Sequence, residues 1–373
     1  MASASPTTPP APQVYDWEPS NAAIAAQYGI DPASVLRFDL NTPPTVNPVA
    51  LEVLDGPFET SLSEYPDADY KVIADAAAAY TGVDPSEIIV GAGADEVLDT
   101  IAKAFLPTRG RAIIPIPTYA MYAVHTSQRG AIADTVLRLP AEQGFRMDLD
   151  QVIARLAGAN VVWLCSPVNP TGLPETPEDL RTLLDAAAAL GPDGPVVVVD
   201  EAYFEFAPAT LIPLRATYPG LIVVRTVSKA FALAGFRVGY AIAQRPTIAR
   251  LEAYRPPNSI TAVSAKVAAA ALSRADETLA RVQATIAERE RFAHALEAIG
   301  IRPLPSVTNF LLLRIGSYAE AESLTEALQR GGVVPRFFGP SHPLAGHIRV
   351  TVRGREQDDR LVTLAKAWKE RAA

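Results

Sequence analysis

Short apolar runs alternate with amphipathic or alanine-rich stretches from about residue 65 to residue 225. The runs cover residues 88–90, 112–115, 161–165, 196–199 and 221–224. Residues 196–199 are all valine, and such an unbroken apolar run is typical of a parallel strand with helices on both faces. Between runs, Thr176-Pro-Glu-Asp179 combines an N-cap residue, a proline at the first helical position and acids in the first turn. The pattern predicts an α/β fold whose mostly parallel sheet is covered by helices on both faces.

A second pattern begins after about Arg274. It predicts a long charged helix over residues 277–299, a strand over 307–313 and a helix over 319–330. Strands near Val333 and Ile348 and a last helix from about Gln357 complete a small α+β domain. We therefore expect a large domain over residues 61–275 and a small domain over residues 276–373. Residues 15–60 are too few and too rich in proline to fold alone, so we expect them to pack with the small domain, and residues 1–14 to form a disordered tail.

Composition narrows the class of protein. Apolar residues make up 49% of the 373 residues and charged residues 20%, as in folded soluble proteins. The net charge of -8 argues against a nucleic-acid partner, because binding to a phosphate backbone requires a basic face. No apolar stretch approaches the roughly 20 residues that cross a bilayer, so we expect no membrane partner. The single cysteine, Cys165, lies in an apolar run and cannot form an intramolecular disulfide, which fits a cytoplasmic protein.

Residues 226–240 contain the most informative chemistry. Lys229 follows a hydroxyl residue, Ser228, and precedes Arg237 and two glycines, Gly235 and Gly239. An amine can form a Schiff base with an aldehyde cofactor, while the hydroxyl and the guanidinium can hold its phosphate oxygens. The glycines let the backbone come close or turn sharply. A lone lysine is more often an ordinary solvated residue, so the interpretation depends on other segments.

Asp200 and Asn169 each follow a predicted strand. Asp200 comes directly after the valine run, at the carboxyl end where open α/β sheets place ligand groups. Its carboxylate can keep a pyridine nitrogen protonated, which makes the ring an electron sink, and Tyr203 can donate to the phenolic oxygen of the same ring. Asn169 can reach that oxygen too, and Asn169-Pro170 is a candidate cis peptide. Taken singly, these segments also suit a capping aspartate and a plain turn.

The turn at residues 91–96 follows another strand and opens a helix. The backbone amides of Ala94 and Asp95 can therefore cap a phosphate. The turn is similar to a dinucleotide-binding loop but lacks the third glycine, and the next strand ends without the acid that holds a ribose, which disfavours a nicotinamide-dependent oxidoreductase. Tyr119 can stack on a planar ring, although an aromatic residue there is more often core. We expect no metal.

Together, these segments resemble the fold type I aminotransferases that use pyridoxal phosphate, most closely the histidinol-phosphate aminotransferase family, over about residues 41–352. The motifs that carry the resemblance are Tyr65-Pro-Asp67, residues 91–96, Asn169-Pro-Thr-Gly172, Asp200-Glu-Ala-Tyr203, Ser228-Lys-Ala230 with residues 235–240, Asn309-Phe310, Arg336 and Arg349. The resemblance implies a large domain that binds pyridoxal phosphate and a small α+β domain. It further implies that Lys229 forms the Schiff base and carries the proton, that Asp200 pairs with the pyridine nitrogen, and that Tyr119 stacks on the ring.

The resemblance assigns the remaining site residues by position. Asn169 and Tyr203 would hold the phenolate oxygen. The phosphate would be held by the amides of Ala94 and Asp95, by Ser228 and Arg237, and by the hydroxyl of Tyr65 from a neighbouring subunit, which implies a homodimer. Arg349 would bind the carboxylate of the amino donor and Arg336 the phosphate of histidinol phosphate. Asn41 and Asn309 would lie near the substrate.

Three segments depart from the family pattern, all on the acceptor side. Asn-Glu-Asn-Pro appears as Asn41-Thr-Pro-Pro44, a Pro-Tyr pair is replaced within Asp16-Trp-Glu-Pro-Ser20, and Arg-Pro-Tyr-Asn reads Arg255-Pro-Pro-Asn258. The reaction that the resemblance implies converts histidinol phosphate and 2-oxoglutarate into imidazole-acetol phosphate and glutamate, in histidine biosynthesis. The alternatives are an aromatic amino acid aminotransferase, a threonine-phosphate decarboxylase-like enzyme and a non-catalytic protein that binds pyridoxal phosphate.

Overall fold

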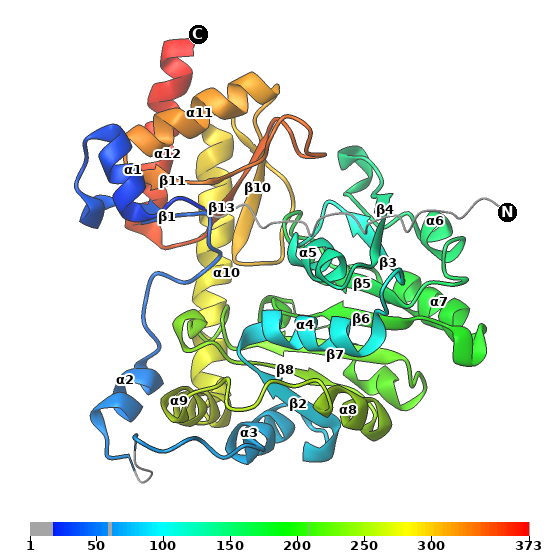
Figure 1. Cartoon of the computed structure of the whole chain (residues 1–373). Coiled ribbons are helices and arrows are strands. Elements are labelled where there is room, and N and C mark those ends of the chain that lie inside the picture. Colours follow the sequence, from blue (N-terminus) through cyan, green and yellow to red (C-terminus); the bar gives the residue numbers. More distant parts are fainter. Residues whose placement is uncertain (1–17, 59–61, 208, 373) are drawn as a thin grey trace, which may run out of the picture.

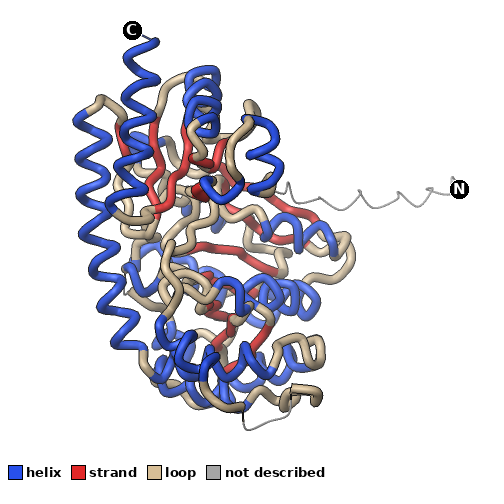
Figure 2. Tube along the Cα trace, turned by 90° about the vertical axis from the view of Figure 1, so that its left-hand side faces the viewer, coloured by secondary structure: helices blue, strands red, loops and turns tan. Residues whose placement is uncertain are grey.

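The computed structural model describes residues 18–58, 62–207 and 209–372. The tail predicted for residues 1–14 lies outside the described residues. The described chain forms a large domain and a small domain (Figure 1), and a view from the side shows the strands enclosed by helices (Figure 2). None of the described helices is long and apolar enough to cross a membrane.

A seven-stranded sheet forms the centre of the large domain. Its strands are β2 (Ile88–Gly91), β3 (Arg111–Ile116), β4 (Ile132–Leu137), β5 (Val161–Cys165), β6 (Val196–Asp200), β7 (Leu221–Thr226) and β8 (Gly239–Ile242). They lie in the order β2-β8-β7-β6-β5-β3-β4, and β8 runs antiparallel to both of its neighbours. Because β5, β6 and β7 are parallel, their carboxyl ends meet at one edge of the sheet.

Helices cover both faces of this sheet. On one face lie α2 (Pro48–Asp55), α3 (Lys71–Thr81), α6 (Leu149–Ile153), α7 (Pro177–Ala188) and α9 (Ala262–Ser273), and on the other lie α4 (Gly93–Phe105), α5 (Met121–Gln128) and α8 (Arg245–Glu252). Successive side chains of β5 enter opposite cores, Leu164 on the first face and Trp163 on the second, so the whole strand is buried. This explains why its sequence is apolar throughout.

The small domain is built on a four-stranded antiparallel sheet. The strands are β9 (Arg302–Pro303), β10 (Phe310–Arg314), β12 (Arg336–Phe337) and β13 (His347–Thr351), and the helices are α10 (Ala275–Ala298), α11 (Tyr318–Arg330) and α12 (Arg355–Ala372). Phe292 of α10, Leu311 and Leu324 lie in its buried core. The long helix α10 runs from the large domain into the small one (Figure 1).

The N-terminal segment is divided between the two domains. After α1 (Asn21–Tyr28), β1 (Leu36–Arg37) pairs in parallel with β11 (Val333–Val334). In contrast, α2 packs against α9, and Val49 and Ala50 belong to the core of the large domain. The expectation that residues 15–60 pack as one piece with the small domain therefore needs correction for α2. We propose that the first domain boundary falls between Asn41 and Asn47, where the chain passes from β1 beside the small domain to α2 on the large domain.

Candidate active site

Lys229 and Asp200 face a common cavity at the carboxyl edge of the large sheet. Asp200 is the last residue of β6, and Lys229 follows the end of β7. The cavity holds about 570 Å³ of empty space. All the predicted cofactor-binding residues except Tyr65 line it: Ala94, Asp95, Tyr119, Asn169, Asp200, Tyr203, Ser228, Lys229 and Arg237. These nine residues, predicted from separate segments of the sequence, come from a helix, a strand end and several loops and line one cavity.

The electrostatics of this cavity suit acid-base chemistry. Burial, with a further contribution from the guanidinium of Arg349, lowers the pKa of Lys229 to about 8. The Lys229 Nζ atom donates a hydrogen bond to the backbone oxygen of Leu40 at 3.2 Å. Burial raises the pKa of Asp200 to about 6, and a hydrogen bond from the hydroxyl of Tyr122, 2.9 Å from Oδ2, opposes the rise. Both groups can therefore change protonation near neutral pH.

A close approach between β8 and the start of α4 shapes the predicted phosphate site. A Cβ atom at Gly239 would come closer than 3.0 Å to the backbone of Ala94, where real Cβ atoms are essentially never found. A Cβ atom at Gly93, whose φ is 81°, would likewise come too close to the guanidinium of Arg237. Arg237 Nη2 lies 3.4 Å from Asp95 Oδ2 at the amino end of this 13-residue helix. A helix amino terminus next to an arginine fits a phosphate group.

The other hydroxyl groups near this position are held by neighbours. The Ser228 hydroxyl accepts a hydrogen bond from Thr226 Oγ1 at 2.8 Å, and the Tyr119 hydroxyl donates to Asp95 Oδ1 at 2.9 Å. The Tyr119 ring lies against the edge of the Tyr122 ring, with centroids 5.7 Å apart. One sequence-based expectation is wrong in detail: Gly235 has open space around its Cβ position and no positive φ, so only Gly239 allows a close approach of the backbone.

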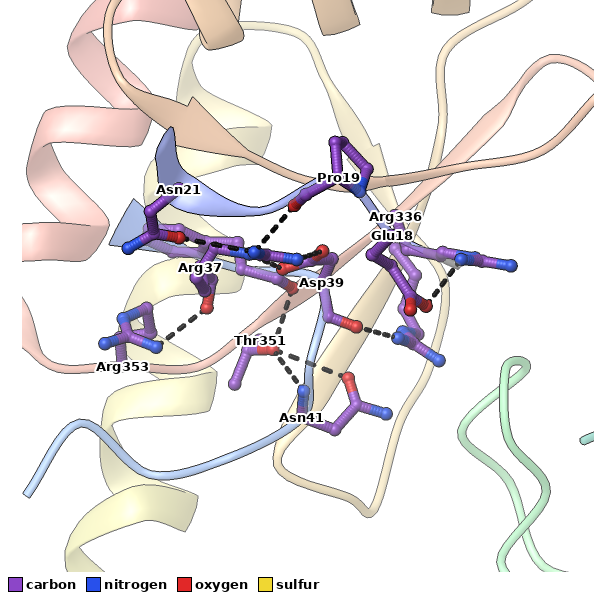
Figure 3. Close-up of polar contacts among 11 residues, drawn as sticks. Glu18, Pro19, Asn21, Arg37, Asp39, Asn41, Arg336, Thr351 and Arg353 are labelled. Atoms are coloured by element: carbon purple, nitrogen blue, oxygen red, sulfur yellow. Dashed lines mark hydrogen bonds and ion pairs between the residues drawn. The ribbon is translucent and has the colours of Figure 1, made fainter. Parts of the chain in front are cut away.

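Two arginines extend the site toward the small domain. Arg336 of β12 and Arg349 of β13 are paired across the small sheet. Both line a second cavity of about 1050 Å³, which also includes Asn41, Tyr119, Asn169, Tyr203 and Lys229. Arg349 Nη1 donates to Asn169 Oδ1 at 2.5 Å, and Arg349 Nη2 donates to the backbone oxygen of Asp39. Arg336 Nη1 lies 2.6 Å from Glu18 Oε1 (Figure 3).

Asn41 and Asn309 lie in one buried network. The Nδ2 atom of Asn41 donates to the hydroxyl of Tyr203 at 2.9 Å, and that of Asn309 donates to the backbone oxygen of Asn41 at 3.0 Å. Asn309 is buried and lines neither of the two cavities that contain Lys229, so its contact with the site runs through the backbone of Asn41. The prediction that it lies near the substrate stays a prediction. The Asn169-Pro170 peptide is cis, as predicted.

Sequence reasoning missed two partners and left one residue outside the site. Tyr122 lies in the first turn of α5 and Glu18 lies on the N-terminal segment, and the sequence predicted no role for either of them. Tyr65 lines neither of the two cavities, and 83% of its surface is exposed. Its predicted role requires a second chain and stays a prediction.

Comparison with known proteins adds an independent line of support. The family model for aminotransferases of class I and II matches residues 36–364. The chain belongs to this family. A histidinol-phosphate aminotransferase from Roseiflexus castenholzii is 34% identical to this aminotransferase over 354 residues, which are 92% of each chain. A relative of the same name from Salmonella typhi is 35% identical over 315 residues, 83% of this chain and 85% of its own.

A solved structure extends the likeness to three dimensions. The histidinol-phosphate aminotransferase from Sinorhizobium meliloti, determined in complex with pyridoxal 5'-phosphate, has a TM-score of 0.87 and 25% identity, with 100% of both chains covered. The predicted fold class is confirmed: a fold type I transferase with a large α/β domain and a small α+β domain. The resemblance to the histidinol-phosphate aminotransferase family is confirmed as well.

Proposed function

We propose that this aminotransferase uses pyridoxal phosphate to convert histidinol phosphate and 2-oxoglutarate into imidazole-acetol phosphate and glutamate. The main support is the identity of 34% to a histidinol-phosphate aminotransferase over 92% of both chains. The geometry agrees with it, because Arg336 and Arg349 line the same cavity as Lys229. Guanidinium groups suit both the carboxylate of an amino acid and the phosphate of this substrate.

The residues around the first cavity fit the cofactor. When bound, pyridoxal phosphate supplies an aldehyde that takes up an amino group and a protonated ring that accepts electrons from the α carbon. Asp200 would keep the ring nitrogen protonated, and Tyr119 would lie against the ring. Ser228, Arg237 and the amino end of α4 would hold the phosphate, where the described structure brings an arginine and backbone amides together.

Lys229 carries the proton in this proposal. Since its pKa is lowered to about 8, a useful fraction of the amine is neutral near neutral pH and can accept a proton. The Nζ atom would take the proton from the α carbon of the amino donor and later return it to the keto acceptor. Arg349 would orient the donor by its carboxylate, because its guanidinium is fixed from two sides by Asn169 and the backbone of Asp39.

A second candidate reaction is transamination of aromatic amino acids. It is favoured by the rings of Phe337, Phe338 and His342 in the second cavity, and by the pairing of Arg336 with Glu18, which leaves Arg349 as the partner for a lone carboxylate. Steady-state kinetics with imidazole-acetol phosphate, phenylpyruvate and threonine phosphate separate the possibilities. We expect imidazole-acetol phosphate to have the highest kcat/KM. Rapid turnover of phenylpyruvate with inert imidazole-acetol phosphate would identify an aromatic aminotransferase, and release of carbon dioxide from threonine phosphate would identify a decarboxylase.

We also propose a homodimer in which Tyr65 reaches the active site of the partner. Exposed apolar side chains gather on and between α2 and α3, at Leu51, Leu54, Leu62, Tyr65 and Val72. Both helices pack against α9 at one end of the large domain (Figure 1). The exposed apolar side chains on and between them therefore suit contact with a second copy.

A mixing experiment tests the shared site. Tyr65→Ala and Lys229→Ala proteins should each have low activity, and a mixture that exchanges subunits should regain part of it. The mixed dimer would then contain one site with an intact lysine from one chain and an intact tyrosine from the other. Monomeric protein by light scattering, or no recovery after proven subunit exchange, would contradict the proposal.

A further inference from the structure

Glu18 places a carboxylate in the substrate cavity, where the proposed reaction gives it no role. Its Oε1 atom lies 2.6 Å from Nη1 of Arg336, and only 19% and 25% of the two side chains are exposed. Both residues line the cavity that contains Lys229 and Arg349. Glu18 thus contacts the arginine that is proposed to bind the substrate phosphate (Figure 3).

The segment that carries Glu18 is anchored next to both arginines. Arg37 Nη1 donates to the backbone oxygen of Pro19 at 2.9 Å and to Asn21 Oδ1 at 3.2 Å. The same guanidinium forms an ion pair of 2.5 Å with Asp39, whose backbone oxygen accepts a hydrogen bond from Arg349. The contacts of Arg37 with Pro19, Asn21 and Asp39 are shown in Figure 3. Glu18 is therefore held in place by polar contacts of the residues that follow it.

The ion pair between Glu18 and Arg336 changes which anions the cavity can bind. Arg336 and Arg349 are adjacent in the small sheet, so together they suit a dianionic phosphate. With Glu18 in contact, the positive charge of Arg336 is neutralised and its Nη1 atom already has a carboxylate partner. In that arrangement Arg349 can still bind a substrate that carries a single carboxylate. A substrate phosphate that approaches Arg336 is instead repelled by the negative charge of Glu18.

We propose that Glu18 is a specificity-determining residue that competes with the substrate phosphate for Arg336. The inference rests on the proposed function in one respect, namely that a phosphorylated substrate enters this cavity. Binding of the phosphate moves the Glu18 carboxylate off the guanidinium, and binding of a single carboxylate at Arg349 does not. Glu18 thus lowers the affinity for phosphorylated substrates relative to substrates with one carboxylate.

Titration calorimetry of the holoenzyme with inorganic phosphate tests this inference directly. Glu18→Gln keeps the shape of the side chain and removes its charge. Because partly exposed ion pairs contribute up to about 1 kcal/mol, we expect the Kd for phosphate to fall about fivefold, and the KM for histidinol phosphate to fall by a similar factor. Glu142→Gln serves as the matched control, since it removes the same charge from a pair with Arg314 outside both cavities and should change neither constant.

The outcomes separate this inference from the proposed function. If Glu18→Gln binds phosphate no more tightly than the wild-type protein, or more weakly, Glu18 supports Arg336 instead of competing with its ligand, and the inference is wrong. If the variant binds phosphate more tightly while neither protein converts histidinol phosphate, the competition holds and the proposed substrate is wrong. Turnover of histidinol phosphate with unchanged phosphate affinity would support the proposed substrate and overturn the competition.

Discussion

The hydroxyl of Tyr122 should control the charge of Asp200, and Tyr122→Phe isolates this effect. Tyr122 is fully buried and stacks on Trp163 with ring planes 3° apart, so the ring should stay in place when its oxygen is removed. Asp200 then loses the hydrogen bond to Oδ2 and keeps only the one from the amide of Ala202 at 3.0 Å.

The size of the effect follows from the charge on the acceptor. A hydrogen bond to a charged group contributes about 1.5 to 3 kcal/mol, and one pKa unit corresponds to about 1.36 kcal/mol. The pKa of Asp200 should therefore rise by roughly one to two units above its present value of about 6. This rise is a change in the folded state alone, so it appears in the pH dependence of stability.

The sign of that dependence is fixed by burial. Since burial holds the pKa of Asp200 above its unfolded value of about 3.9, the folded state binds more protons between these values, and the free energy of unfolding falls as pH rises through that window. In Tyr122→Phe the window extends roughly one to two units higher. The loss of stability caused by the substitution should then be about 1.5 to 3 kcal/mol greater at about pH 8.5 than at about pH 5.

Urea unfolding of the apoenzyme at the two pH values measures this difference. Tyr70→Phe is the matched control, because the Tyr70 hydroxyl is buried but accepts its hydrogen bond from the uncharged backbone amide of Ile260, 3.0 Å away. The control should lose the same stability at both pH values. An equally constant loss in Tyr122→Phe would refute the link between its hydroxyl and the Asp200 charge.

Three further predictions concern the rest of the site. The pKa of Lys229 is lowered to about 8, so the apoenzyme should attach pyridoxal phosphate covalently at a rate that rises with pH, with a midpoint near that value. Intact mass after borohydride reduction measures the attachment, which should vanish in Lys229→Ala. A rate that does not change with pH would contradict this prediction. Arg349→Lys loses the bidentate guanidinium and should lower kcat/KM for glutamate roughly ten- to hundredfold in steady-state assays, and a smaller change would mean that another group binds the carboxylate. Gly239→Ala should lower the free energy of unfolding by about 1 to 3 kcal/mol, and with it the Tm in calorimetry, because the new Cβ meets the backbone of Ala94. In the control Gly235→Ala the new Cβ enters open space, so the Tm should stay nearly unchanged.

The strands that a sequence reveals are those buried on both faces. The continuous apolar runs of β5 and β6 predicted these strands to within one residue, because no polar position interrupts them. The edge strand β4 was missed, since Ile132 is 56% exposed and its neighbours are mixed in polarity. β8 was missed because its glycine was assigned to a binding loop, and its antiparallel direction has no local signature.

The residues of the candidate site likewise fall into those that the sequence could place and those that it could not. Residues at or just after the carboxyl ends of parallel strands, such as Asp200 and Asn169, could be placed together because the fold brings those strand ends to one edge. Tyr122 could not, since an aromatic residue in the first turn of a helix has the pattern of ordinary core. The contact between Glu18 and Arg336 joins residues 318 positions apart, and only the folded small domain determines it.

The backbone of the described chain passes between the two domains at two places only, residues 41–47 and α10. The first contains Pro43 and Pro44, whose rings fix φ, and the second is an unbroken helix of 24 residues. Two connections define a single axis, so the small domain can rotate relative to the large domain mainly about the line that joins them. A domain closure that moves Arg349 toward Lys229 is therefore a rotation about this axis. A ligand that contacts both the arginine and the lysine would favour one angle between the two domains.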